Sequence, residues 1–389
     1  MCLLTLTAFL FQSFTTASQL YAASYAGTVT SLGLSKHNDS SYQLTALFQT
    51  YDCGPSPSWL TLDGENDVLY CLDEGIDRPN ATLTSFKPFS NGTLTKINQL
   101  QIPGPVASAF YTAAYSEERF MAVAHYSSSA LTTYTLHPLT GHFTPHQTIK
   151  FSLSIPGPIP SRQDAPHPHG VVVDPKGQFL LIPDLGADLV RIFHINPVTG
   201  WLTEQESLVV APGSGPRHAV FWVPEQNDPI SQPGGYRLYL VTELDNTPRG
   251  YEVVYPRNNT IQFSQFFEEN TFGGGIPPPG GKAAEIAISP ANTHILVSNR
   301  NDTTFGPRND SISDFSCIES GKDSFTGLYP AYGSFPRHFE FSPDGGMLAV
   351  ALQDEKIVIA EWDAENGAIG EKVAEGWVEG EVTAVIWEF

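Results

Sequence analysis

The residues of this chain that could carry chemistry are histidines and arginines placed directly before apolar runs. The stretch "DAPHPHGVVV" has two histidines ahead of a run, and "GPRHAVF" and "FPRHFEF" each have an Arg-His pair ahead of one. Two other apolar runs, in "LVTEL" and "LVSNR", end on a glutamate and an arginine. Histidine transfers protons near neutral pH and arginine pairs with carboxylates, so the group suits a polycarboxylate or a lactone. The residues are His167, His169, Arg217, His218, Glu243, Arg300, Arg337 and His338.

Each of these residues also has a purely structural interpretation. An arginine can pair with a neighbouring carboxylate and tie parts of the fold together. His167 and His169 could bind a metal from one strand, but no third ligand follows at a recognisable spacing, so no metal is expected. The glycine-rich "TFGGGIPPPGGK" lacks P-loop spacing, and no nucleophile elbow stands out. We therefore expect a site without a cofactor, and we expect Asp184 and Asp188 to cap turns.

The elements that carry these residues are short strands. Runs rich in Val, Ile, Leu, Tyr and Phe are separated by Gly, Pro, Asn and Asp, and helical periodicity is nearly absent. A strand–turn–strand pattern recurs about every fifty residues, which predicts an all-β, seven-bladed β-propeller. The alternative is a pair of β-sandwiches, which would not need this period. The six visible units begin at Trp59, Thr112, His169, His218, Ala284 and His338.

The two ends of the chain are expected to supply the seventh blade. Strand-like segments over Tyr25–Leu34 and Glu381–Phe389 have no unit of their own, and pairing them would close the ring and protect its edges. In such a ring the start of each blade's first strand and the end of its second lie at the same end of the central channel. The histidines, the arginines and the glutamate are therefore predicted to meet at one channel mouth.

Composition excludes several classes of partner. The chain has 41 acidic and 20 basic residues and a net charge of −21. Such a surface repels phosphate backbones and anionic lipid, so no nucleic acid is expected as a partner. The oligomeric state is left open by the sequence.

The N-terminus predicts secretion. An apolar run over residues 3–11, followed by small polar residues, resembles a signal peptide over 1–17, with one mature domain over 18–389. The run is too short to span a bilayer, so no membrane insertion is expected after its removal. The rival interpretation is a buried first strand, and the usual basic residues before the run are missing. Six sequons favour a secreted glycoprotein: Asn38, Asn80, Asn91, Asn258, Asn301 and Asn309.

The cysteines fit an oxidising compartment. If Cys2 leaves with the signal peptide, three remain, and Cys53 and Cys71 bracket a predicted hairpin. We predict a disulfide between these two and a free thiol at Cys317.

Several motifs together resemble a known family. "HPHGVVVDPKGQFLLIPDLGADLVRIF", "GPRHAVFW", "LVTELDN", "LVSNRND" and "GEVTAVIWEF" are similar to the seven-bladed propeller lactonases, and within them most to the fungal carboxy-cis,cis-muconate cyclases. The likeness runs from about Tyr21 to the C-terminus. It implies catalytic roles for His169 (or His167), Arg217, Glu243 and Arg300. His218, Arg337 and His338, with His167, are expected at the substrate.

Two function classes follow. The first is a cofactor-free enzyme in which the arginines hold carboxylates while His169 or Glu243 moves a proton, forming a γ-lactone from a muconate-type acid. Run as a hydrolysis, the same residues would open a lactone, as in the 6-phosphogluconolactonases of the same family. The second class is a secreted propeller that binds a carboxylate or a protein partner without chemistry.

Overall fold

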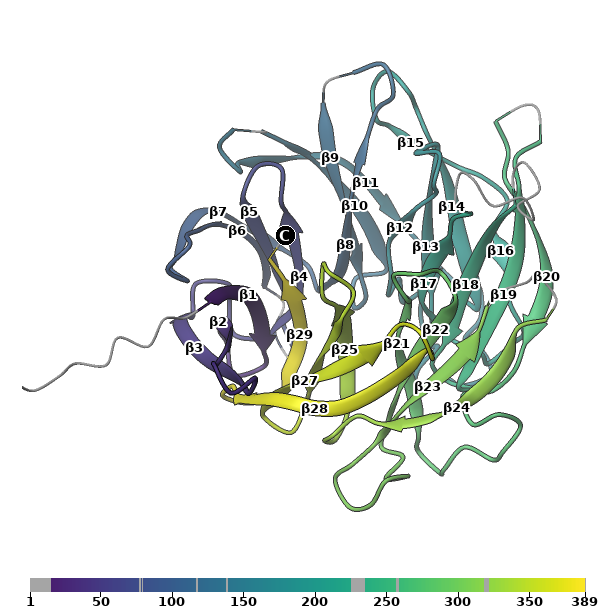
Figure 1. Ribbon diagram of the computed structural model, residues 1–389. Coiled ribbons are helices and arrows are strands. Elements are labelled where there is room, and N and C mark those ends of the chain that lie inside the picture. The colour runs from purple at the N-terminus through teal and green to yellow at the C-terminus, as the bar shows by residue number, and fades with distance from the viewer. Residues whose placement is uncertain are drawn as a thin grey trace, which may run out of the picture.

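The computed structural model describes residues 15–388, apart from 77, 79, 117, 138, 225–234, 257–258 and 318–321. These residues form strands and turns and no helix, hence no helix that could cross a membrane. The strands build seven sheets that stand side by side around one axis (Figure 1). Each sheet contacts the next all the way around, through the innermost strands at every junction except that of blades three and four, where the second strand of blade three contacts the innermost strand of blade four. The prediction of a seven-bladed β-propeller is confirmed.

Six blades are continuous in sequence, and in each of them the innermost strand comes first. In chain order the strands of these blades run from the inside outward. Blade one has β4 (Pro57–Asp63), β5 (Val68–Asp73), β6 (Ala81–Pro88) and β7 (Leu94–Ile102), and blade two has β8 (Pro105–Thr112), β9 (Arg119–His125), β10 (Ala130–Leu136) and β11 (Phe143–Lys150). Blade three has β12 (Val172–Val173), β13 (Phe179–Asp184), β14 (Leu189–Ile195), β15 (Leu202–Glu204) and β16 (Leu208–Val209), and blade four has β17 (Pro216–Trp222), β18 (Tyr236–Thr242), β19 (Thr247–Val254) and β20 (Gln262–Glu268). Blade five has β21 (Lys282–Ile288), β22 (His294–Arg300), β23 (Ser311–Ser316) and β24 (Ser324–Pro330), and blade six has β25 (Pro336–Phe341), β26 (Met347–Leu352), β27 (Lys356–Asp363) and β28 (Ala368–Trp377).

The seventh blade joins the two ends of the chain. The C-terminal β29 (Val382–Trp387) is its innermost strand, and β1 (Thr15–Ser24), β2 (Thr28–Lys36) and β3 (Tyr42–Thr50) follow outward. The expected segments do share this blade, but the direct neighbour of β29 is β1, not the Tyr25–Leu34 segment. The start of β1 falls within the predicted signal peptide, most of which (residues 1–14) lies outside the described residues. The ladder between β1 and β2 is regular only from Ser18 onward.

Burial explains why the second strand of a blade is so apolar. Every residue of β5 ("VLYCLD") and of β13 ("FLLIPD") is buried, because each blade packs both faces against its neighbours. In the outer strand β7 only the two end residues are buried, and those between them are exposed or half-buried. The hydrophobic clusters accordingly lie between adjacent blades.

The structure joins Cys53 and Cys71 in a disulfide and leaves Cys317 buried with a free thiol. Four of the sequon asparagines are exposed (Asn38, Asn80, Asn91 and Asn301), and Asn309 is half-buried. Asn258 lies outside the described residues.

Candidate functional site

A bulge at the start of the inner strands places two of the arginines. In β17 the register skips one residue between Pro216 and His218, and in β25 it skips one between Pro336 and His338. The extra residues are Arg217 and Arg337. A bulge re-aims the side chain of its extra residue, because that residue breaks the strand's regular alternation. Proline is accepted at the first position of a strand, where no backbone N–H is needed for the ladder. The "PRH" motif is thus the local sequence of a bulge that delivers an arginine to the channel.

Glu243, directly after β18, is surrounded by three arginines. Its Oε1 lies 2.7 Å from Arg162 Nη2, and its Oε2 lies 2.9 Å from Arg300 Nη2 and 3.2 Å from Arg217 Nε. The carboxylate side chain is only 3% exposed. Burial alone would raise the pKa of Glu243, but the three arginines hold it well below its usual range. Glu243 is therefore a permanent anion that positions guanidinium groups, and the expectation that it transfers a proton fits this environment poorly.

His169 lies in a buried layer beside this cluster. Its backbone N–H donates to Pro183 O, so it continues the line of the inner strand ahead of β12. Its ring contacts that of His218 edge-on, with centroids 5.2 Å apart, and its Nδ1 is buried without a hydrogen-bond partner among the described residues. Burial, together with the charge of Arg217, holds the pKa of His169 well below its usual value. His169 is thus a neutral base at physiological pH.

His218 and His338 share a second buried carboxylate. His218 Nδ1 lies 2.8 Å from Glu285 Oε1, and His338 Nε2 lies 3.9 Å from Glu285 Oε2. Trp59 packs edge-on against both imidazoles. Burial lowers the pKa of both histidines, so each is neutral near pH 7 and His218 donates its Nδ1–H to Glu285. This layer orients the histidines and encloses a void of about 10 Å³ that His169, Arg217 and Arg337 also line.

His167 is tied down away from this layer. Its Nδ1 lies 2.9 Å from Tyr126 O and its Nε2 lies 3.0 Å from Asp164 Oδ1, while its ring stacks on that of Tyr126. Both ring nitrogens are therefore engaged. Of the two histidines in "HPHG", the structure brings only His169 against the His218 ring and the void.

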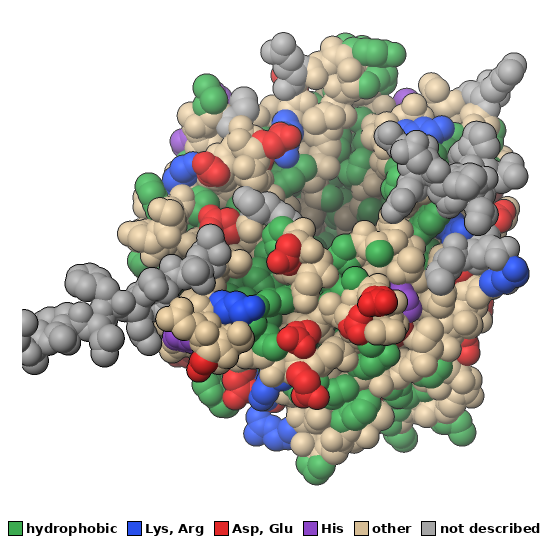
Figure 2. Space-filling view, in the orientation of Figure 1, with side chains coloured by type: hydrophobic (Ala, Val, Ile, Leu, Met, Phe, Trp, Pro, Cys, Tyr) green, Lys and Arg blue, Asp and Glu red, His purple; other side chains and the backbone are tan. Residues whose placement is uncertain are grey.

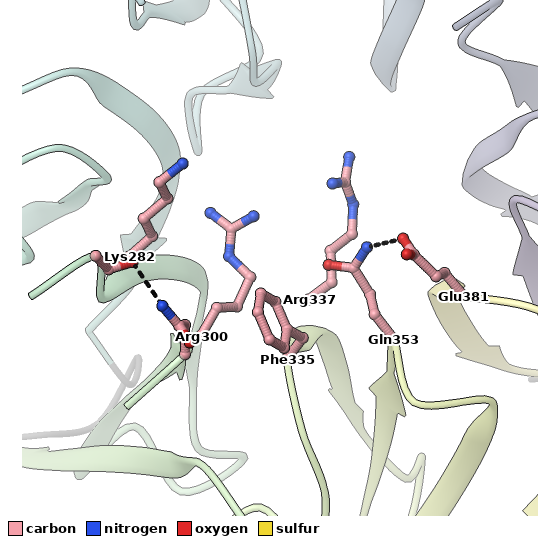
Figure 3. Close-up of a pocket in the computed structure, with 8 residues that line it drawn as sticks. Lys282, Arg300, Phe335, Arg337, Gln353 and Glu381 are labelled. Atoms are coloured by element: carbon pink, nitrogen blue, oxygen red, sulfur yellow. Dashed lines mark hydrogen bonds between the residues drawn. The ribbon is translucent and has the colours of Figure 1, made fainter. Parts of the chain in front are cut away.

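A larger pocket of about 480 Å³ opens beside the cluster. Figure 3 shows the side chains of Lys282, Arg300 and Arg337 extending into it in the same direction, and Gln353 bound to Glu381 at one side. Arg337 has one weak ion pair, at 3.6 Å to Glu74, and stacks over the Tyr25 ring. No described carboxylate lies within ion-pair distance of Lys282. The lining residues are Gly280, Lys282, Arg300, Asn301, Phe335, Arg337, Gln353 and Glu381.

The pocket concentrates positive charge that is costly to bury. Burial lowers the pKa of Lys282 and of Arg300, both of which line the pocket. Cations in this state are stabilised by any anion that enters. The outer surface is different, since Figure 2 shows Asp and Glu side chains spread over the visible face. A cationic pocket in an acidic protein selects small anions over extended polyanions.

Five residues on which the site depends were not predicted: Arg162, Lys282, Glu285, Trp59 and Phe335. Arg162 lies in the proline-rich loop before "DAPHPHG", where no strand pattern marks it. Trp59 occupies the position after the bulge in β4, equivalent to His218 and His338, and the aligned starts of the repeat could have identified it. Glu285 lies within the irregular register of β21.

Two expected structural roles are found. Asp184 accepts hydrogen bonds from the backbone N–H groups of His167 and Ala187 and pairs with Arg191, and Asp188 accepts from those of Gly213 and Gly215. Within the described part of the chain, no cluster of three or more His, Cys, Asp or Glu side chains could hold a metal ion.

Comparison with known proteins gives a consistent family. The sequence model described as "Lactonase, 7-bladed beta-propeller" matches residues 19–387. The chain is 29% identical over 317 residues to a probable 6-phosphogluconolactonase of Arthroderma benhamiae, covering 81% of this chain and 75% of that protein. It is 24% identical over 319 residues to the 6-phosphogluconolactonase of Bacillus subtilis, covering 81% and 82%.

A solved structure confirms the architecture. The periplasmic gluconolactonase of Pseudomonas aeruginosa aligns with a TM-score of 0.76 at 23% identity, over 96% of this chain and 99% of that one. At this identity the likeness shows the fold alone. The sequence relatives carry the name of a lactone hydrolase, so they favour lactone opening over the muconate cyclisation that the sequence motifs had suggested.

Proposed function

Since the chain belongs to the seven-bladed β-propeller lactonase family, we propose that it is a hydrolase that opens a small anionic sugar lactone. One observation carries the proposal. Lys282, Arg300 and Arg337 extend into a single pocket, and the neutral His169 lies beside Arg337 at the adjoining void. The reference substrate is 6-phosphogluconolactone, after the relatives that bear its name.

The cations bind and polarise the substrate. Lys282 is the least neutralised of them and takes the charged substituent of the sugar, because a compact ammonium suits a phosphate or carboxylate oxygen. Arg300 and Arg337 face the lactone carbonyl and stabilise the negative charge that develops on its oxygen during attack. A preorganised donor of this kind contributes about 3–4 kcal/mol to transition-state stabilisation.

His169 activates the water. A neutral imidazole accepts a proton as the water oxygen bonds to the carbonyl carbon, and it returns that proton to the ring oxygen when the ring C–O bond breaks. Products are the open-chain acid and its new hydroxyl group, and the enzyme is unchanged. Glu243 takes no proton in this scheme, because its role is to hold Arg162, Arg217 and Arg300 in place.

The test is turnover of 6-phosphogluconolactone by the purified protein, measured against spontaneous hydrolysis. We expect hydrolysis by the wild type and its loss in His169→Asn. A parallel assay with 3-carboxymuconate tests the cyclising direction, which would use the same arginines. Binding of 6-phosphogluconate without any turnover would favour the non-catalytic alternative and reject the hydrolase.

We also propose that the mature chain begins near Ser18 and is secreted. The regular β1–β2 ladder starts at Ser18, and β1 pairs with β29 from Leu20 to Ser24, so removal of residues 1–17 would keep these pairs and lose only that of Thr15 with Lys36. The exposed sequon asparagines agree with glycosylation. Mass spectrometry of secreted material tests both points: an intact Met1 terminus or unmodified sequons would contradict them.

A further inference from the structure

Phe335 has an unfavourable backbone conformation at the pocket wall. Its φ is +55°, a left-handed value that a bulky side chain rarely adopts, and it precedes Pro336, which restricts the preceding residue toward extended backbone. The residue is 40% exposed although it lines the pocket. This residue has a strained backbone and is not fully buried, so folding stability does not explain its presence. Strained residues of this kind cluster at functional sites.

The surroundings of Phe335 hold it in this conformation. Its backbone N–H donates to Asp310 Oδ2 at 2.7 Å, and its carbonyl accepts from Gln353 N at 3.1 Å. The same Asp310 carboxylate accepts the N–H groups of Asn301 (2.8 Å), Asp302 (3.1 Å) and Thr303 (2.9 Å). One buried carboxylate thus fastens the segment that follows Arg300 to the segment that precedes Arg337. The backbone of Phe335 is thereby held relative to both segments.

Figure 3 shows the Phe335 ring between the Arg300 and Arg337 side chains, at the base of the open space into which they extend. An aromatic face flanked by cations suits a ligand with a C–H face and anionic substituents. A closed sugar ring has such a face, whereas an open-chain polyol keeps no single flat side. We propose that Phe335 is a specificity-determining residue: its ring packs against the carbon face of a cyclic sugar acid or sugar phosphate and makes the site prefer the closed ring to the open-chain product. This inference rests on the proposed function, and it names the closed ring as the feature of the substrate that the site recognises.

The experiment compares two probes of equal charge that differ in ring closure: glucose 6-phosphate, which is cyclic, and sorbitol 6-phosphate, which is open. Calorimetry on the full chain measures both dissociation constants for the wild type, Phe335→Gly and Phe335→Ala. We expect both variants to bind glucose 6-phosphate about three- to tenfold more weakly, the range of an aromatic face contact, with sorbitol 6-phosphate binding unchanged. We expect Phe335→Gly to melt at a higher temperature than Phe335→Ala, because glycine adopts φ of +55° without strain and alanine does not.

Arg308 supplies the matched control. It also has a left-handed φ, of +61°, but its side chain is 74% exposed and does not line the pocket. Arg308→Gly and Arg308→Ala should show the same order of melting temperatures with no change for either probe. Equal weakening of both probes in the Phe335 variants, or no weakening of the cyclic one, would overturn the inference, as would a wild type that binds neither. A wild type that prefers the cyclic probe through Phe335 but hydrolyses no lactone would reject the hydrolase and leave this inference standing.

Discussion

Arg162 Nη2 lies 2.7 Å from Glu243 Oε1, although Arg162 belongs to the loop ahead of blade three and Glu243 to blade four. This ion pair fastens a proline-rich loop over the buried cluster and completes the set of three arginines around one carboxylate. Removing the anion leaves three cations facing one another in a buried space. The pair therefore helps to hold the arginine cluster around Glu243 in place.

The first prediction concerns this pair. Glu243→Gln should lower the free energy of unfolding by about 3–5 kcal/mol, the usual cost of breaking a buried ion pair from one side. Adding Arg162→Met removes one of the stranded cations and should recover part of the loss, with a coupling of about 1–3 kcal/mol. Urea unfolding of the wild type, both single variants and the double variant measures it. Additive effects would show that Arg162 and Glu243 act independently.

The second prediction separates the two histidines of "HPHG". His169→Asn should reduce kcat by about 10²- to 10⁴-fold with KM nearly unchanged, because the variant still binds the lactone but lacks the base. His167→Asn is the control, since both ring nitrogens of His167 are engaged with Tyr126 O and Asp164. Steady-state kinetics on 6-phosphogluconolactone measures both. A larger loss of kcat in the His167 variant would assign the base to His167.

The third prediction is the pH dependence of turnover. His169 acts as a base only when neutral, that is, at pH values above its own pKa, and burial holds that pKa well below 6.5. The value of kcat/KM, corrected for spontaneous hydrolysis, should therefore stay level as the pH falls through 6.5 and decline only in more acidic solution. An acid limb centred at or above pH 6.5 would contradict the buried, neutral state of His169.

The fourth prediction distinguishes the two bulge arginines. Arg217 is 2% exposed and donates to Ala284 O as well as pairing with Glu243, so Arg217→Ala should cost about 3–5 kcal/mol of folding stability. Arg337 extends into the pocket with one long ion pair, so Arg337→Ala should instead raise KM and weaken binding by about 2–5 kcal/mol. Thermal unfolding and kinetics on each variant test the split. Equal losses of stability with unchanged KM would make both arginines structural.

The sequence predicted the fold well because a propeller repeats its local signals in every blade. The recurring strand–turn–strand pattern was enough to predict that one end of the channel would hold His169, Arg217, Glu243 and Arg300. The role of Glu243 was harder to predict. A buried carboxylate surrounded by several cations stays an anion and does not transfer a proton. One of the three cations around Glu243 is Arg162, which comes from a loop with no periodic sequence pattern.

The first strand shows a second feature that the sequence alone did not determine. An apolar leader and the start of an apolar strand have similar composition, so the residues alone support both a signal peptide over 1–17 and a first strand that begins within it. In the structure β1 pairs regularly with β2 from Ser18 and with β29 from Leu20, and Thr15 still pairs with Lys36.

The shared seventh blade also imposes an order on synthesis at the ribosome. Blades one to six are contiguous, so each can assemble soon after its last strand emerges. Strands β1, β2 and β3 emerge first, yet β1 lacks its inner neighbour until β29 has been translated at the very end of the chain. Throughout elongation β1 therefore keeps an open hydrogen-bonding edge of the kind that recruits other strands. The nascent chain must shield that edge, alone or with a chaperone, until the last residues arrive.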